Sequence, residues 1–174
     1  KIIFNKDATF MNNYAYWMGG AFYDWSEGES TEFNGNALFM NNMSAEDGGA
    51  IFVEDNAFMT FNKKATFIGN IATLNGGAIY NDDDTLMTFE GEATFLGNTA
   101  LSSDGYGGAI VNDGILKFND SVIFSGNVAQ GQGADIHNGL HTYSTAVVEL
   151  AYGKDKMGSF DGGIYQVEDG EIHK

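Results

Sequence analysis

Apolar and polar residues alternate along short stretches of this chain, which is typical of β-strands with one buried face. In the stretch L-M-T-F at 86–89, Met87 and Phe89 share one side and the residues between them share the other. A few residues later, Ala93 and Phe95 flank an outward Thr in the same way. Gly, Asn and Asp fill the gaps between such stretches, and helix signals are missing, so the pattern predicts strands joined by tight turns.

Two short motifs return along the chain at a nearly fixed interval. The first, F-x-x-N, comprises Phe10, Phe39, Phe67, Phe95 and Phe124 with Asn13, Asn42, Asn70, Asn98 and Asn127, and its copies are 29, 28, 28 and 29 residues apart. The second, G-G-A, begins at Gly19, Gly48, Gly76 and Gly107. A further set of Phe at 4, 33, 61, 89 and 118 keeps the same intervals. Three strand-like stretches lie in each repeat, as at 77–80, 86–89 and 93–95.

Short strands in repeats of this length predict an all-β fold, a parallel β-helix in which each turn stacks on the last. We expect three strands per turn of about 28 residues, five to six turns, and a right-handed coil from the general bias of β crossovers. The Phe sets would form two interior ladders, and the Asn set a third at a bend. We expect one continuous domain, with regular turns over 1–139 and a degenerate last turn plus a C-terminal cap over 140–174.

The alternation of G-G-A-[ILV] with F-x-x-N resembles the repeats of the chlamydial polymorphic membrane proteins and related bacterial and algal β-helix proteins. The G-G-A-I form occurs at 48–51, 76–79 and 107–110, and Gly19-Gly20-Ala21-Phe22 is a variant of it. The resemblance covers about residues 4–138. It implies a surface-exposed, secreted passenger of autotransporter type, a kind of protein that is often adhesive.

Charge narrows the choice of partners. Eight Lys, no Arg and twenty-four Asp and Glu give a net charge of −16, which repels phosphate backbones and anionic lipid headgroups. Nucleic-acid binding is therefore not expected. No apolar run approaches the roughly 18 residues that a spanning helix needs, so the chain is not expected to be transmembrane. Cys is absent, so no disulfide framework exists.

Carboxylates follow each G-G-A strand, at Asp24 and Glu27 and again at Asp113. The densest group comprises Glu54, Asp55, Asp82, Asp83 and Asp84. One interpretation is a solvated rim that keeps the edge of the stack soluble. The other is a site for Ca²⁺, a hard cation that takes several oxygen ligands. Neither a D-x-[DN]-x-[DN]-G loop nor a G-G-x-G-x-D nonapeptide is present, and no other cofactor is expected.

Catalysis is not expected from this sequence. Polysaccharide-cleaving β-helix enzymes act through carboxylate pairs, or through Ca²⁺ with an Arg or Lys base, and Arg is missing. Asp135 and His137 alternate on a strand-like stretch and could form an acid–base pair, but we interpret them as surface groups.

Aromatic residues crowd the first turn, which contains both Trp of the chain. They are Tyr14, Tyr16, Trp17, Phe22, Tyr23 and Trp25. One interpretation is a core plug that closes the stack. The other is an exposed patch for a protein partner, a neighbouring domain or a glycan, because Tyr and Trp are frequent at binding hot spots and stack on sugars.

One loop is longer than its equivalents. Eight residues separate Asn98 from Gly107, where the other repeats have five. Insertions in solenoids map to loops on one face and often carry the binding, so Ser103, Asp104 and Tyr106 are candidate contact residues. A tolerated insertion is the other interpretation.

These observations favour a non-catalytic β-helix binding module, an adhesin-like passenger that is secreted or lies at the cell surface. The first alternative is an accessory or scaffold subunit whose N-terminal end docks on a larger assembly, in the periplasm or the lumen of an organelle. The second is a polysaccharide-active β-helix enzyme.

Overall fold

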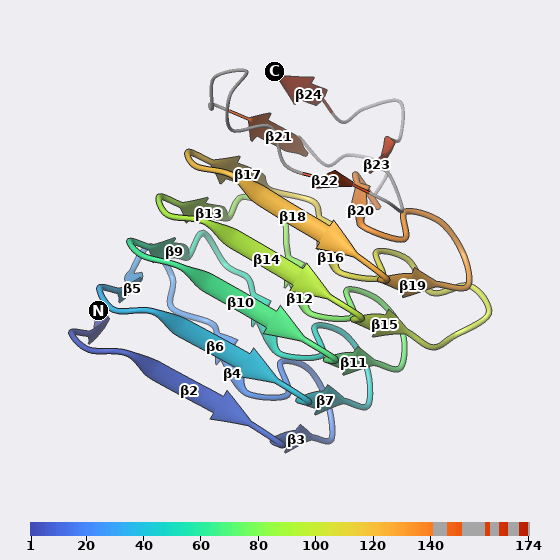
Figure 1. Cartoon of the computed structure of the whole chain (residues 1–174), viewed down its shortest axis with the longest axis horizontal. Helices are drawn as coiled ribbons and strands as arrows, with labels where there is room; N and C mark the ends of the chain where they lie inside the picture. Colours follow the sequence, from blue (N-terminus) through green and yellow to red (C-terminus); the bar gives the residue numbers. More distant parts are fainter. Residues whose placement is uncertain (141–145, 151–158, 161–163, 167–170, 174) are drawn as a thin grey trace.

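The structure is a computed structural model that describes residues 1–140, 146–150, 159–160, 164–166 and 171–173. Its strands coil into about five turns of roughly 29 residues, and all pairings between turns are parallel. Equivalent strands of successive turns form four sheets that run the length of the stack (Figure 1). The predicted parallel β-helix is confirmed, and the right-handed sense of the coil stays a prediction.

We number the sheets in the order in which each turn visits them. The first contains β1 (Ile2–Phe4), β5 (Ser30–Phe33), β9 (Phe58–Phe61), β13 (Leu86–Phe89), β17 (Ile115–Phe118), β21 (Val147–Leu150) and β24 (Glu171–His173). The second contains β2 (Ala8–Met11), β6 (Ala37–Met40), β10 (Ala65–Ile68), β14 (Ala93–Leu96), β18 (Val122–Ser125) and β22 (Ser159–Phe160).

The third and fourth sheets are made of shorter strands. The third contains β3 (Tyr14–Ala15), β7 (Met43–Ser44), β11 (Ile71–Ala72), β15 (Thr99–Ala100) and β19 (Val128–Ala129). The fourth contains β4 (Phe22–Asp24), β8 (Ile51–Val53), β12 (Ile79–Asn81), β16 (Ile110–Asn112), β20 (Ile136–Asn138) and β23 (Ile164–Gln166). Each turn thus has four strands where the sequence predicted three. The additional strand consists of the two residues that directly follow the motif Asn, which pair with their equivalents in the neighbouring turns.

Two ladders of Phe fill the core of the coil. Phe39, Phe67 and Phe95 of the second sheet stack with centroids 4.8–4.9 Å apart and interplanar angles of 4°. The Phe set of the first sheet stacks in the same way, with 4.8 Å between Phe61 and Phe89. The two ladders meet edge to face, as Phe61 and Phe67 do at 84°. Every ring therefore has both stacked and T-shaped neighbours, an arrangement that aromatic pairs prefer.

A buried ladder of Asn lines the bend between the second and third sheets. The side-chain amide of Asn70 donates to Oδ1 of Asn98 at 3.0 Å and to the carbonyl oxygen of Phe39 at 3.1 Å. Oδ1 of Asn70 accepts from both the backbone N–H and the side chain of Asn42, each at 3.0 Å. Each inner Asn thus satisfies its own polar groups and those of the bend, which burial requires.

The two glycines of each G-G-A corner serve different purposes. The first adopts a left-handed backbone, with φ of 64° at Gly76. The second lies against the next turn, and a Cβ on Gly77 would stand 2.1 Å from the carbonyl oxygen of Gly108. No residue other than glycine fits that approach, so the corner sets the spacing between turns.

The outer faces of the sheets differ in charge. The first sheet carries Glu32, Lys117 and Glu149 outside, and Lys117 Nζ lies 3.0 Å from Glu149 Oε2. The outer side of the fourth sheet is covered by residues of the connecting loops: Phe52, Tyr80 and Val111 are buried against Met18, Tyr106 and Leu140.

In contrast, no strand residue of the second and third sheets is charged, among those that the structure describes. Their outward side chains form three rows that we call the charge-free face. One row is Thr9, Leu38, Thr66, Thr94 and Ile123. The next is Met11, Met40, Ile68, Leu96 and Ser125. The third is Tyr14, Met43, Ile71, Thr99 and Val128.

Beyond Leu140 the structure describes only part of the chain. β21 pairs with β17 and continues the first sheet, and β22, β23 and β24 extend the second, fourth and first sheets. The expected C-terminal cap falls partly on residues outside the described ranges, and the boundary at 139/140 stays a prediction.

Candidate functional site

Five aromatic side chains of the first turn are exposed to solvent. Their exposed fractions are 62% for Tyr14, 73% for Tyr16, 66% for Trp17, 47% for Tyr23 and 68% for Trp25. Phe22 differs, because it is partly buried and packs against the core. The core-plug interpretation therefore holds for Phe22 and is wrong for the other five. They form two groups, before and after the Gly19-Gly20 corner.

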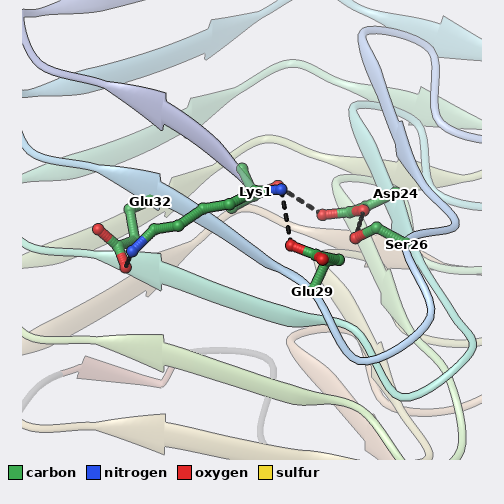
Figure 2. A network of polar contacts seen from close by, with 6 residues as sticks. Lys1, Asp24, Ser26, Glu29 and Glu32 are labelled. Carbon is green, nitrogen blue, oxygen red and sulfur yellow. Dashed lines mark hydrogen bonds and ion pairs between the residues drawn. The ribbon is translucent and has the colours of Figure 1, made fainter.

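The turn that carries Trp25 is fixed by a buried carboxylate (Figure 2). Asp24 lies at the end of β4 and accepts hydrogen bonds from the Ser26 hydroxyl at 2.5 Å and from the Thr31 hydroxyl at 2.6 Å. The N–H of Glu29 donates to the carbonyl oxygen of Ser26 at 2.8 Å, which closes the turn. Trp25 is thus an exposed indole on an anchored loop, and little conformational entropy opposes its use in binding.

The strand that follows this loop, β5, also pairs with the side chain of Lys1. Its Nζ lies 2.8 Å from Glu32 Oε1 (Figure 2). Both side chains are partly exposed, so this ion pair adds little to the stability of the fold.

Tyr16, Trp17 and Tyr23 are also held in place. The rings of Tyr16 and Trp17 meet edge to face at 6.4 Å, and the carbonyl oxygen of Trp17 accepts from the N–H of Glu46 at 3.0 Å. Tyr23 packs edge to face on Phe52 and its hydroxyl donates to Glu54. Burial, with the Glu54 carboxylate beside the hydroxyl, raises the pKa of Tyr23 to about 12.

The longer loop divides into an exposed tip and an inserted ring. Leu101, Ser103 and Asp104 are exposed at the tip. Tyr106 instead turns inward, and its ring centroid lies 4.6 Å from that of His137. Of the predicted contact residues, Ser103 and Asp104 are exposed and their role in contact stays a prediction, whereas Tyr106 helps to cover the fourth sheet.

The acidic turns do not form one solvated rim. Asp55, Asp83 and Asp84 are exposed and Glu54 and Asp82 are half-buried, but Asp24 and Asp113 are buried, so the rim interpretation is wrong for those two. Asp113 accepts from the Tyr80 hydroxyl at 2.8 Å and from the N–H of Leu140 at 2.5 Å. Within the described ranges, no three side chains of His, Cys, Asp or Glu are grouped closely enough to hold a metal ion.

The interpretation of Asp135 and His137 as surface groups is also wrong, because both are buried. Asp135 accepts from the side-chain amide of Asn127 at 3.0 Å, at the C-terminal end of the Asn ladder. His137 packs under Tyr106 on the outer side of the fourth sheet, and burial lowers its pKa to about 4 although Asp113 opposes the shift.

A second Asn ladder was missed in the sequence. Asn81 donates to Oδ1 of Asn112 at 2.8 Å, and Asn112 donates to Oδ1 of Asn138 at 2.7 Å. It begins at Asn81 because the preceding turn has Val53 there, and Oδ1 of Asn81 has no hydrogen-bond partner among the residues that the structure describes. The signal was an Asn three residues after the G-G-A alanine, repeated at the same interval as the motifs.

The architecture and the repeated corner define a class, the parallel β-solenoids. The repeat of the Chlamydia polymorphic membrane proteins matches residues 30–54, 64–82 and 92–113. The chain is therefore a β-solenoid, and these three stretches of it match the repeat of the Chlamydia polymorphic membrane proteins. That family consists of surface-exposed outer-membrane autotransporters and is associated with non-enzymatic surface proteins.

No match was found for the chain among curated proteins or solved structures. A search of the described residues for a helix long and apolar enough to cross a membrane found none.

Proposed function

We propose that this chain is a non-catalytic binding module of a surface-exposed, adhesin-like protein, and that the exposed aromatics of its first turn make the contact. The observation that carries the proposal is the exposure of Trp17 and Trp25 on anchored loops. In the next turn their positions hold Glu46 and Glu54, so the aromatics are a local departure from the repeat.

The chemistry of this surface suits a glycan or an uncharged protein patch. Indole and phenol rings offer flat apolar area with a polar edge, which stacks on sugar rings and anchors protein interfaces. A net charge of −16 opposes acidic partners. The proposed binding role rests on the surface-exposed character of the repeat family and on the exposed aromatics of the first turn.

The chain contains its own reporter for this test. Its two Trp lie one in each of the two aromatic groups, so indole fluorescence reports on the exposed aromatics of the first turn alone. The probes are a printed array of neutral and sialylated oligosaccharides and a panel of fibronectin, collagen and laminin, with hits confirmed by fluorescence titration.

We expect Trp17→Ala and Trp25→Ala each to weaken binding about tenfold or more. The matched controls are Leu74→Ala and Leu101→Ala, which remove apolar side chains with 40% and 50% exposure elsewhere on the surface. A ligand that binds the double Trp variant as tightly as the native chain would contradict the proposal, as would binding that both controls weaken equally.

A further inference from the structure

We propose that the charge-free face binds a second copy of this chain, face to face, in a two-fold symmetric dimer. The face includes Tyr14 at its N-terminal edge but not the loops of Trp17 and Trp25, and the inference does not rest on the proposed function. Figure 1 shows the second sheet as a broad, open layer, with the short strands of the third sheet continuing beyond its bend.

The first argument is the pattern of the strands themselves. β6, β10 and β14 read A-L-F-M, A-T-F-I and A-T-F-L, with apolar residues or Thr on both faces. The inner side chains contact the Phe core, while outward residues such as Met40 and Ile68 have no layer above them among the described residues. The outer face of the first sheet, by contrast, carries Glu32, Lys117 and Glu149, so an outer face without charge distinguishes the second sheet within the same coil.

The second argument is charge. The connections that border the face carry Asp7, Lys64 and Glu92 on one side and Glu46 and Asp104 on the other. Lys64 Nζ and Glu92 Oε1 pair at 2.5 Å within that border. An apolar surface inside a charged border is typical of a protein interaction site.

The net charge of the chain also indicates which partner the charge-free face binds. A copy of a chain with a net charge of −16 can approach another copy without opposing carboxylates only through a face that has none. Two such faces bury no unpaired charge when they meet, which is the costly event at an interface. A two-fold axis through the face brings the same rows together from both copies.

The size of the face fits a modest dimer. Five strands about 4.8 Å apart and three rows about 7 Å apart span on the order of 500 Å² in projection. Stable interfaces bury about 800 Å² of accessible surface per partner. Because side-chain relief adds accessible area to the projection, the buried area falls near the lower end of the standard interface size, which is typical of weak or transient association.

Sedimentation velocity of the native chain, from low micromolar to several hundred micromolar, tests the proposal. We expect reversible dimerisation that tightens about tenfold as salt rises from low to moderately high concentration, because salt screens the repulsion between the two acidic bodies. Ile68 lies at the centre of the charge-free face and is the residue to substitute. Ile68→Glu would place two carboxylates opposite each other and weaken the dimer by at least about a hundredfold.

The matched control is Ile115→Glu, which makes the same change at a half-buried outward position of the first sheet. We expect it to dimerise as the native chain does. A monomer at every concentration and salt overturns the proposal, and so does a dimer that Ile68→Glu leaves intact.

A measurement on the native chain removes any dependence on the folding of the variants. Met11, Met40 and Met43 lie on the charge-free face, Met18 lies off it, and Met59 and Met87 are in the core. We expect peroxide oxidation of Met40 and Met43 to slow as the chain is concentrated, while the rate at Met18 stays constant. Rates at Met40 and Met43 that do not change with concentration would place any association elsewhere and overturn the proposal.

Discussion

The side-chain amide of Asn127 donates a hydrogen bond over 3.0 Å to the buried carboxylate of Asp135, eight residues further along the chain. Every earlier Asn of the ladder donates to the Asn of the next turn, so the direction of donation is the same throughout. At the last motif Asn, a residue of a different type from a different position supplies the acceptor. Asp135 thus ends a hydrogen-bond chain that would otherwise leave a buried donor unsatisfied.

Removing that acceptor is expected to destabilise the fold. Asp135→Ala leaves the Asn127 amide with only its hydrogen bond to the carbonyl oxygen of Phe95 and should lower the free energy of unfolding by about 2 kcal/mol. Asp135→Asn keeps an oxygen acceptor and should recover most of the loss. Urea denaturation measures both, and equal destabilisation by the two variants would show that acceptance from Asn127 is not what matters at this position.

The middle of the ladder is expected to be more sensitive. Asn70→Ala removes two donors and an acceptor that serves Asn42 twice, so we expect a loss of about 3 kcal/mol. The control is Asn62→Ala, which removes an exposed amide contact with Asn34 and should cost less than about 0.5 kcal/mol. If both variants lose a similar unfolding free energy in the same urea titration, burial of the Asn70 amide does not add to its contribution to stability.

The two kinds of glycine predict opposite tolerances. Gly77→Ala places a Cβ 2.1 Å from the carbonyl oxygen of Gly108 and should cost more than about 3 kcal/mol or abolish folding. Gly97, unlike Gly77, has a left-handed backbone, with φ of 61°, and no atom lies within 4 Å of its added Cβ. Asn12 and Asn41 occupy the same place in their turns with φ of 57° and 54°.

Gly97→Asn should therefore change the midpoint of thermal unfolding by only a few degrees, because Asn tolerates this backbone region. Comparison of melting curves for the two variants checks the pair. A Gly97→Asn variant that is as unstable as Gly77→Ala would mean that backbone conformation, rather than the approach of the next turn, governs these positions.

His137 predicts a loss of stability in acid. Burial lowers its pKa to about 4 from an ordinary value of 6.5, so below pH 6.5 the unfolded chain binds a proton that the folded chain does not. Its contribution is complete above about pH 6.5 and is lost as the pH falls toward 4, by up to ~3 kcal/mol.

The carboxylates of the chain also titrate in this range, so the measurement is a difference between two proteins. His137→Phe, a residue type found in the same row at Phe52, cannot take up the proton. The gap in unfolding free energy between the variant and the native chain should widen in favour of the variant from pH 6.5 to pH 4. A gap that is constant across this range would show that His137 does not titrate on unfolding.

The architecture was predictable because the repeat exposes it. Phe67, Asn70 and Gly76 return at an almost fixed interval, and only stacked turns bring such residues together. The count of strands was less accessible, because a two-residue strand such as Ile71–Ala72 is too short to show an alternation.

Whether a single polar residue is buried or exposed could not be predicted from the sequence. Asp24, Asp113 and Asp135 are the same residue type in similar turns as the exposed Asp83. What buries them is contact with hydroxyl, amide and backbone groups in other turns or loops. Those partners depend on register and loop packing, which short-range sequence patterns do not contain. The exposure of Trp17 and Trp25 was likewise one of two open alternatives until the loops were placed.

The fixed register between turns has a consequence for how such chains change in length. Ala65 to Ile68 align residue for residue with Ala37 to Met40 on one side and with Ala93 to Leu96 on the other. Excising residues 65–92 would join Lys64 directly to Ala93, so Lys64 would again be followed by Ala and the register of the remaining strands would be kept. The molecule can therefore be shortened or extended by whole turns with its cross-section unchanged. Its first and last turns, where the repeat is irregular, would stay as they are.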